Sequence, residues 1–586
     1  MFKLIKNFTK KDWMIIVASI ALIFMQVWLE LKMPDYMSQI TVLVETEGSA
    51  MSEILKNGFY MLACAFGSLI GAIVVGFMIA KLSAGFSKNL RNQIFSKVEN
   101  LSMNEIKGFS TNSLITRTTN DVTQIEMFVG MGLQLLIKAP ITAIWAITKI
   151  LNKSWEWSAV TAVAVVILLS VIGILVLLVL PKFKIVQKLT DKLNGVTREN
   201  LLGIRVVRAF NAEEYQQNKF ENVNNELTNL QLFNQKSMAV MSPVMYLIMY
   251  MLTLSIYFIG AYLIKDAMMA DKIGLFGDMV VFSSYAMQII MAFLMLAMIF
   301  MILPRAQVSA NRINEVLDTE VSVKNGKLEK NVTGEKGTVE FKNVSFKYPD
   351  AEEYLLKNIS FKANQGETVA FIGSTGSGKS SLVNLIVRFY DVTDGEILVD
   401  GVNVKDYNEK FLYNKIGYVP QKAVMFNGTV NENIAYGDNG KKMTKEKIKE
   451  AALVAQAQEF ILNMDKQYDT HIAQGGTNVS GGQKQRLSIA RAIARDPEIY
   501  IFDDSFSALD YKTDAVLRAE LKKYTRNATS LIVAQRIGTI MNADKIIVLD
   551  QGTCVGMGTH KELLKNCDVY REIALSQLTK EELENA

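Results

Sequence analysis

The chain has 586 residues, of which 50% are hydrophobic, and its formal net charge is +5. This length exceeds that of one domain, and so high a hydrophobic fraction indicates a membrane part rather than a wholly soluble protein. The small net charge gives no sign of a nucleic-acid partner, and the cysteines at positions 64, 554 and 567 lack the spacing of a metal site or a disulfide framework.

Apolar stretches long enough to cross a membrane occur six times before residue 305 and not afterwards. The segments between the second and third stretches, and between the fourth and fifth, are long and rich in Lys and Arg. By the positive-inside rule these two segments and both termini are cytoplasmic, which predicts a multi-pass protein of the cell membrane. The expected spans are residues 13–31, 58–80, 128–151, 157–180, 240–264 and 278–303.

The two long basic segments have a 3.6-residue pattern, so we expect the membrane helices to continue into the cytosol as paired rods. Residues 1–304 are therefore predicted to form an α-helical membrane domain. A polar stretch with Gly-containing turn signals predicts a linker over residues 305–337. Short β-like runs then alternate with helical patterns, which is typical of an α/β domain, here residues 338–586.

A phosphate-binding loop of the form G-x-x-x-x-G-K-S follows a strand-like run at residues 368–372 and precedes a helical pattern. The glycines of such a loop allow backbone N–H groups to surround a phosphate, and the helix adds its positive N-terminal end. Lys379 would neutralise phosphate oxygens, and Ser380 would be a hydroxyl ligand of Mg²⁺. The chain is thus predicted to bind a nucleoside triphosphate. The expected binding residues are Gly373, Ser374, Thr375, Gly376, Ser377, Gly378, Lys379, Ser380 and Ser381.

Two further motifs narrow the class of nucleotide-binding protein. The run at residues 499–503 is a buried strand that ends in Asp503, a carboxylate suited to holding Mg²⁺ through water. Upstream of it, a Ser-Gly-Gly-Gln sequence opens a predicted helix and makes a second anion site, which is useful only where a second phosphate is presented to it. Its residues are Ser480, Gly481, Gly482 and Gln483.

In this order and spacing, and with six preceding spans, the motifs resemble the ATP-binding-cassette (ABC) family, and the chain looks like an ABC exporter half. The resemblance implies an α/β P-loop ATPase domain with ATP and Mg²⁺ as cofactors. It implies that Gln421 links Mg²⁺ to the membrane helices and that Ser480 to Gln483 are the signature motif. Tyr348 would stack on adenine, and an ordinary half-buried strand tyrosine is the alternative. A coupling helix is expected near residues 211–215.

Each such cassette needs the signature of another cassette to close over its ATP, so one cassette per chain implies a dimer. The family normally follows the Mg²⁺ aspartate with a glutamate that polarises the attacking water, but this chain has Asp504. Losing one methylene withdraws the carboxylate by roughly 1.5 Å, and a misplacement of about 1 Å can cost about a hundredfold in rate. Gln535 stands where the family usually has histidine, and it cannot carry a positive charge.

We therefore expect this chain's own site to bind ATP and to cleave it slowly or not at all, unless Asp504 and Gln535 work adequately together. A homodimer would contain two weakened sites. The sequence thus favours a heterodimer with a second half-transporter that supplies the Glu and His, resembling the heterodimeric bacterial multidrug exporters with one degenerate site. The alternatives are a homodimeric exporter with slow hydrolysis and a non-transporting, ATP-sensing regulatory subunit.

The expected cargo is amphiphilic, such as drugs, lipids or peptides, and the sequence does not specify it further. Lys138 is a charge inside the third span, where it would contact anionic cargo or reach toward an interface. Methionines at helical spacing would either line a cavity or face lipid and neighbouring helices. They are Met238, Met241, Met245 and Met249 in the fifth span and Met287, Met291, Met295, Met298 and Met301 in the sixth.

Overall fold

The computed structural model describes residues 2–46, 48–151, 153–440 and 442–578. Within this part the chain forms two compact units. The first unit contains the described residues up to Glu99 together with Thr111–Thr319. The second contains the described residues from Glu320 onward together with the short segment Asn100–Ser110. This short segment therefore belongs to the second unit although it lies between helices of the first.

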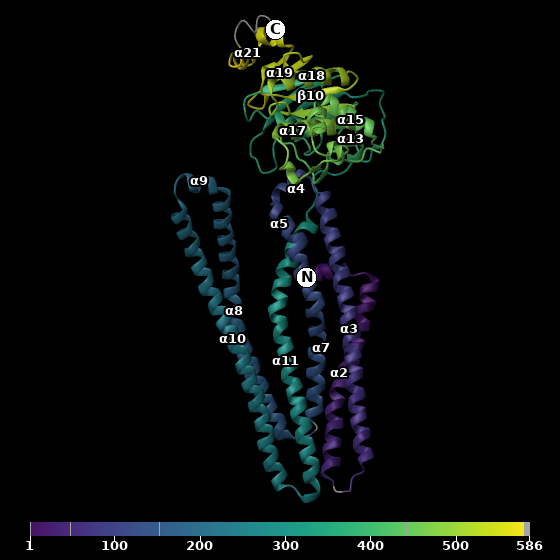
Figure 1. The fold of residues 1–586 in the computed structure, drawn as a ribbon, viewed down its shortest axis with the longest axis vertical. Coiled ribbons are helices and arrows are strands. Elements are labelled where there is room, and N and C mark those ends of the chain that lie inside the picture. Colours follow the sequence, from purple (N-terminus) through teal and green to yellow (C-terminus); the bar gives the residue numbers. More distant parts are fainter. Residues whose placement is uncertain (1, 47, 152, 441, 579–586) are drawn as a thin grey trace. The chain divides into compact units, whose positions relative to one another are not determined.

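The first unit is made of long helices that run side by side (Figure 1). Six helical stretches among the described residues are long and apolar enough to cross a membrane, which confirms the predicted number. The third is composite, because two π-helical turns interrupt it. The helices are α1 (Phe2–Ile5), α2 (Lys10–Glu45), α3 (Met51–Glu99), α5 (Thr111–Thr116), η1 (Arg117–Asp121), α6 (Val122–Met127), η2 (Phe128–Gly132), α7 (Leu133–Leu151), α8 (Trp155–Leu202), α9 (Ile204–Ala209), α10 (Glu213–Asp266) and α11 (Met269–Asp318).

These helices extend well past the apolar spans, as the helical pattern of the flanking basic segments predicts. Helix α11 continues to Asp318, so residues 305–318, which the sequence assigns to a polar linker, are helical instead. The short helix between α8 and α10 spans Ile204–Ala209 rather than the expected residues 211–215. It begins after Gly203, which ends α8 and lowers local helix stability.

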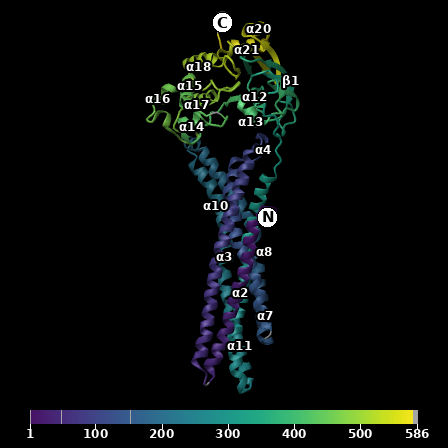
Figure 2. The same cartoon turned by 90° about the vertical axis from the view of Figure 1, so that its right-hand side faces the viewer.

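Figure 2 shows the membrane-length helices from a second side. One hydrophobic core of buried side chains joins them. Trp157 of α8 is buried in this core, and its indole N–H donates to the carbonyl oxygen of Ile256 in α10 at 3.1 Å. The ring of Trp157 also lies 5.4 Å from that of Phe282 in α11. Since an indole N–H must find a partner when buried, this hydrogen bond fixes how α8 packs along α10.

The second unit is built on a six-stranded sheet of order β12-β11-β3-β10-β9-β6, in which all neighbours are parallel except the edge strand β12. A four-stranded antiparallel sheet has the order β2-β1-β4-β5, and β7 pairs with β8. The strands are β1 (Val339–Phe346), β2 (Leu356–Ala363), β3 (Thr368–Gly373), β4 (Asp394–Val399), β5 (Val402–Asn403), β6 (Ile416–Val419), β7 (Gly428–Thr429), β8 (His471–Ile472), β9 (Ile499–Asp503), β10 (Thr529–Val533), β11 (Lys545–Asp550) and β12 (Thr553–Gly558).

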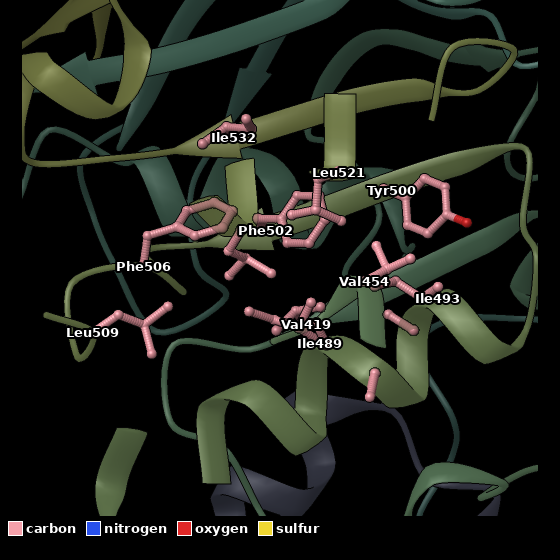
Figure 3. Packing of buried hydrophobic residues seen from close by; sticks show 14 of the residues in the cluster. Val419, Val454, Ile489, Ile493, Tyr500, Phe502, Phe506, Leu509, Leu521 and Ile532 are labelled. Atoms are coloured by element: carbon pink, nitrogen blue, oxygen red, sulfur yellow. The ribbon is translucent and has the colours of Figure 1, made fainter. Parts of the chain in front are cut away.

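Both faces of the parallel sheet are covered, which explains why its strands are apolar throughout. In β9, Ile499 and Ile501 belong to one hydrophobic cluster, whereas Tyr500 and Phe502 belong to another. This alternation follows from the two-residue period of a strand. In the second cluster Phe502 packs against Phe506, with ring centroids 5.3 Å apart (Figure 3).

Most helices of the second unit are short, and they surround the two sheets. The six-residue helix α4 comes from the segment before α5, and the others alternate with the strands as the sequence predicts. The helices are α4 (Met103–Gly108), α12 (Lys379–Ile386), α13 (Glu409–Lys415), α14 (Val430–Ile434), α15 (Lys445–Val454), α16 (Gln458–Leu462), η3 (Gln467–Asp469), η4 (Gln474–Gly476), α17 (Gly481–Ala494), α18 (Tyr511–Tyr524), α19 (Ile537–Ile540), α20 (His560–Asn566) and α21 (Asp568–Leu575).

Candidate nucleotide site

The predicted site residues gather at the carboxyl ends of four adjacent parallel strands, β3, β10, β9 and β6. Parallel strands end at the same edge of a sheet, so segments that are far apart in the sequence meet there. The phosphate loop follows β3, Gln535 follows β10, and Gln421 follows β6. Asp503 ends β9, and Asp504 comes directly after it.

Two glycines give the phosphate loop its shape. A Cβ atom on Gly373 would overlap the carbonyl oxygen of Leu549 in the neighbouring strand β11. Gly378 has a φ of +94°, and a Cβ there would lie 2.6 Å from Cδ2 of Leu356. Only glycine fits both positions, and helix α12 begins immediately afterwards at Lys379.

The ammonium group of Lys379 is held inside this loop. It donates to the carbonyl oxygens of Gly373 at 2.9 Å and Ser374 at 2.7 Å. Burial lowers the pKa of Lys379, and the nearby carboxylates of Asp504 and Asp503 oppose that effect. The loop therefore contains a partly desolvated cation of the kind that binds phosphate oxygens.

Ser380 and Asp503 form a second part of the site. The Ser380 hydroxyl donates to Oδ1 of Asp503 at 2.8 Å. Asp503 is buried, and burial raises the pKa of its carboxyl, with the hydrogen bond from Ser380 acting in the opposite direction. Hydroxyl and carboxylate oxygens are ligands that Mg²⁺ prefers. The described residues contain no group of three His, Cys, Asp or Glu side chains that could hold a metal ion, so waters and phosphate oxygens would complete the shell of a Mg²⁺ bound here.

The two positions that depart from the family pattern lie together around Asp504. Its Oδ2 atom accepts hydrogen bonds from Nε2 of Gln535 at 2.8 Å and from Nε2 of Gln421 at 3.1 Å. Asp504 has a φ of +48°, a left-handed conformation that costs a non-glycine residue roughly 1–3 kcal/mol. Its backbone N–H donates to the carbonyl oxygen of Val533 at 3.0 Å, which helps to hold this conformation.

A small cavity of about 10 Å³ lies beside Asp504 and Gln535. This is close to the smallest volume that accepts one water molecule. A water in this cavity would lie near Asp504 and Gln535, the two side chains that the sequence identifies as catalytic candidates. Its lining residues are Asp504, Phe506, Ser507, Val533, Ala534, Gln535, Arg536 and Thr539.

The signature residues are positioned by a helix cap of their own. Ser480 is the N-cap of α17, and its hydroxyl accepts a hydrogen bond from the backbone N–H of Gln483 at 3.3 Å. The side chain of Gln483 accepts in return from the backbone N–H of Ser480 at 2.9 Å. Ser480 and Gly481 are exposed, and a Cβ on Gly481 would meet no heavy atom within 4 Å. The helix N-terminus at Ser480 to Gln483 is therefore open on its outer side.

Tyr348 follows strand β1 and is half-buried. Its hydroxyl is 2.8 Å from the hydroxyl oxygen of Ser381, in the helix that follows the phosphate loop. Its ring packs perpendicular to that of Tyr390, and the ammonium of Lys107 lies 4.5 Å from the ring centroid. Sequence reasoning missed Tyr390 and Lys107. In the sequence, the only signal for Tyr390 is its place in a pair of adjacent aromatic residues after helix α12. No sequence signal marks Lys107.

In the first unit, Lys138 is paired with an acidic residue. Its ammonium lies 2.9 Å from Oε1 of Glu30 in α2. The sequence did not identify this partner, which neutralises the charge proposed to contact anionic cargo. In the fifth span Met245 is buried in the helix core, whereas Met291 and Met298 in the sixth are exposed. The side chain of Met301 lies outside the described residues.

Comparison with known proteins is consistent with this geometry. Residues 14–293 match the family described as ABC transporter transmembrane region, and residues 356–507 match the family described as ABC transporter. An ABC transporter ATP-binding protein of Mycobacterium tuberculosis (strain ATCC 25618 / H37Rv) is 39% identical over 547 residues, which cover 92% of this chain and 93% of the relative.

An ATP-dependent lipid A-core flippase of Pseudomonas aeruginosa is 34% identical over 508 residues, which cover 86% of this chain and 82% of the flippase. A solved structure of a bacterial Atm1-family ABC exporter with ATP bound has the same fold, with a TM-score of 0.82 at 24% identity, and the match covers 97% of this chain and 99% of that chain. This chain therefore belongs to the ABC transporters and joins their transmembrane region and their ATP-binding domain in one polypeptide.

Proposed function

We propose that the chain is one subunit of a heterodimeric, ATP-driven exporter and that its own phosphate loop binds ATP but supports only slow cleavage. The observation that carries this proposal is the environment of Asp504. Its Oδ2 atom accepts hydrogen bonds from both Gln421 and Gln535. A general base must accept a proton from water, and the Oδ2 lone pairs that two amides already engage do so poorly, which leaves Oδ1 for that role. The side chain is also one methylene shorter than the glutamate of the family pattern.

The remaining residues are suited to binding rather than cleavage. The loop N–H groups and Lys379 would hold the phosphates, and Ser380 and Asp503 would hold Mg²⁺, with Gln421 beside them. Mg²⁺, when bound, neutralises charge that develops on the phosphates. Gln535 can orient a water through its amide but supplies no positive charge. The site would therefore keep ATP in place and stabilise the paired cassettes.

A partner chain is supported by two surfaces. The open helix N-terminus at Ser480 to Gln483 has N–H donors that suit a phosphate. Within this chain, Ser480 and Gln483 bond to each other, so a phosphate for this site has to come from another cassette. The tip formed by α9 and its flanks exposes large apolar side chains, with 80% of Leu202 and 79% of Phe210 accessible to solvent. Apolar groups gathered at one tip are typical of an interaction surface. We propose that the signature closes over the partner's ATP and that this tip docks on the partner's cassette.

The proposed cargo is an amphiphilic molecule moved outward from the cytoplasm or the inner leaflet. The likeness to a lipid A-core flippase over most of the chain supports a lipid-like cargo. The Lys- and Arg-rich segments between the second and third spans and between the fourth and fifth support a cytoplasmic position for the ATP-binding domain.

The test is ATP turnover by the complex of this chain with a co-purifying half-transporter that carries the family's Glu and His. Lys379→Ala should slow turnover only partly, because it weakens the slow site. Gly481→Asp should nearly abolish turnover, because it places a carboxylate where the partner's phosphate must bind. Its Cβ has open space, so the fold should tolerate it. Gly334→Asp is the matched control, since Gly334 is also exposed and unobstructed. Equal losses from Lys379→Ala and Gly481→Asp would argue against two unequal sites.

Two simpler experiments address the alternatives. Fast ATP turnover by the chain alone that survives Asp504→Ala would contradict the slow site and favour a homodimer. ATP-dependent accumulation of a dye in inverted vesicles that contain the pair, lost with Gly481→Asp, would separate an exporter from an ATP-sensing regulatory subunit.

A further inference from the structure

Helix α4 belongs to the same compact unit as the nucleotide site, and it is firmly anchored there. Ser102 caps it, and the Ser102 backbone N–H donates to the carboxylate of Glu105 at 3.0 Å. The Ser102 hydroxyl lies 2.9 Å from the hydroxyl oxygen of Ser322, whose backbone N–H donates to Glu105 at 3.3 Å. These bonds fix the direction in which the last turn of the helix, with Lys107, projects.

Lys107 projects into a corner formed by two tyrosines. The rings of Tyr348 and Tyr390 are nearly perpendicular, at 89°, with centroids 5.2 Å apart. The Lys107 ammonium lies 4.5 Å from the centroid of Tyr348 and 5.1 Å from that of Tyr390. Both distances are within the roughly 6 Å range of a cation–π contact. The neighbouring Tyr390 side chain raises the pKa of Lys107, so the group remains a cation near neutral pH.

Tyr348 in turn connects this corner to the phosphate loop. Its hydroxyl is 2.8 Å from that of Ser381, which lies in the first turn of α12. The ring is therefore restrained at its hydroxyl by the loop helix, at one side by Tyr390 and at a face by the ammonium of Lys107. The Phe346 ring also packs against that of Tyr348, with centroids 5.0 Å apart and an interplanar angle of 75°. A base would stack on the ring surface that Lys107, Tyr390 and Phe346 leave free.

We infer that Lys107 is a positioning residue of the nucleotide site, which holds the Tyr348 ring as the platform for the base and makes base affinity depend on helix α4. This inference rests on the proposed role of Tyr348 at the base. The segment Asn100–Ser110 is then linked to the bound nucleotide through one of its side chains, that of Lys107. No direct contact of Lys107 with the nucleotide is required.

The test compares two ligands on the full chain in detergent, Mg-ATP and Mg-tripolyphosphate, which lacks a base. Lys107→Met removes the charge but keeps the length of the side chain. It should weaken ATP binding about two- to fivefold, the range of an exposed cation–π contact, and leave tripolyphosphate binding unchanged. Lys107→Arg keeps a cation and should restore ATP binding. Lys347→Met is the matched control, because Lys347 lies 5.7 Å from the ring of Tyr354, another tyrosine of the same unit.

A double-mutant cycle checks that the effect passes through Tyr348. Tyr348→Leu should weaken ATP binding, and adding Lys107→Met to it should have no further effect. The inference is overturned if Lys107→Met leaves ATP binding unchanged, strengthens it, or weakens both ligands equally. If Lys379→Ala and Tyr348→Leu also leave ATP binding unchanged, the nucleotide-site assignment itself fails. If those two variants weaken binding and Lys107→Met does not, only the role of Lys107 fails.

Discussion

The side-chain amide of Gln535 donates a 2.8 Å hydrogen bond to Oδ2 of Asp504. The two positions at which this chain departs from its family are thus in direct contact. Glutamine at one position accompanies the shorter acid at the other, and Gln421 donates to the same oxygen at 3.1 Å. Both amides therefore bind the same oxygen of the Asp504 carboxylate.

The first prediction restores the family residues at this site. Asp504→Glu with Gln535→His should raise ATP turnover by the chain alone about tenfold or more, because the longer acid recovers roughly 1.5 Å of reach. Asp504→Glu alone should give a smaller gain. Steady-state phosphate release measures the effect, and adding Lys379→Ala should remove it. A double variant no faster than the original chain would contradict the proposal that these two residues limit turnover.

The motifs of the candidate nucleotide site could be identified from the sequence because each lies within a few residues. The phosphate loop after β3 and Asp503 at the end of β9 each carry their function within a few residues. Sheet order then brings them together, and a parallel α/β pattern implies this outcome. Gln535 and Asp504 could be identified as departures, but their hydrogen bond depends on β9 and β10 being neighbours.

The contacts that sequence reasoning missed depend on helix packing. Lys138 and Glu30 are 108 positions apart in the sequence and meet only because α2 and α7 pack together. Lys107 reaches Tyr348 only because its short helix joins the second unit. Neither pairing has a local signature, since an isolated Lys or Glu on a helix is compatible with many partners. The start of α9 is marked in the sequence only by Gly203, at which α8 ends and α9 begins.

The second prediction concerns the ion pair between Lys138 and Glu30, whose side chains are 17% and 24% exposed. Lys138→Met leaves the carboxylate without a counter-charge among apolar helices and should destabilise the first unit by about 2 kcal/mol, less than the 3–5 kcal/mol of a fully buried pair. Lys138→Met with Glu30→Gln should recover most of the loss. Ser68 can still donate to the amide oxygen of the new glutamine, as it does to Glu30 at 3.1 Å.

Thermal unfolding in detergent, followed by tryptophan fluorescence, measures both variants. The signal reports on the first unit alone, because every tryptophan of the chain precedes residue 158. A double variant as unstable as Lys138→Met would contradict the argument that the unpaired carboxylate of Glu30 causes the loss.

The third prediction concerns a buried ion pair in the second unit. The ammonium of Lys415 lies 2.6 Å from Asp400 and 2.9 Å from Glu498, and the Lys415 and Asp400 side chains are only 5% and 2% exposed. Lys415→Met should destabilise this unit by about 3–5 kcal/mol, because it leaves a buried carboxylate unpaired. Hydrogen exchange of the β6 and β9 amides should report the loss as faster opening.

A surface pair provides the control for this experiment. Lys523 is 2.7 Å from Glu520, but the two side chains are 70% and 41% exposed. Lys523→Met should change exchange in the same strands by less than about 1 kcal/mol. Similar effects of the two variants would contradict the argument that burial, rather than ion pairing as such, makes Lys415 important.

The last prediction is a pH dependence of stability that arises at His560. This side chain is buried, and its Nδ1 atom lies 2.7 Å from the hydroxyl oxygen of Tyr570. Burial, followed by the charge of Lys561, lowers the pKa of His560 below its usual 6.5. The folded state therefore favours neutral histidine, and as pH falls below 6.5 the unfolded chain binds a proton that the folded chain resists. Stability should fall over that window by up to about 1.4 kcal/mol per pH unit.

His560→Phe with Tyr570→Phe removes the titrating group without leaving an unpaired buried hydroxyl. Between pH 7.5 and 5.5 the second unit of this variant should lose less stability than that of the original chain, as judged by hydrogen exchange of the β11 amides at matched intrinsic rates. The chain's other histidine, His471, is exposed and serves as an internal control, since His471→Gln should leave the pH dependence unchanged. The original chain, the double variant and His471→Gln contain the same carboxylates. A difference in pH dependence between the original chain and the double variant therefore comes from the pair of residues 560 and 570, of which only His560 titrates in this range. Equal slopes in the original chain and the double variant would show that the folded unit accepts a charged His560 without cost.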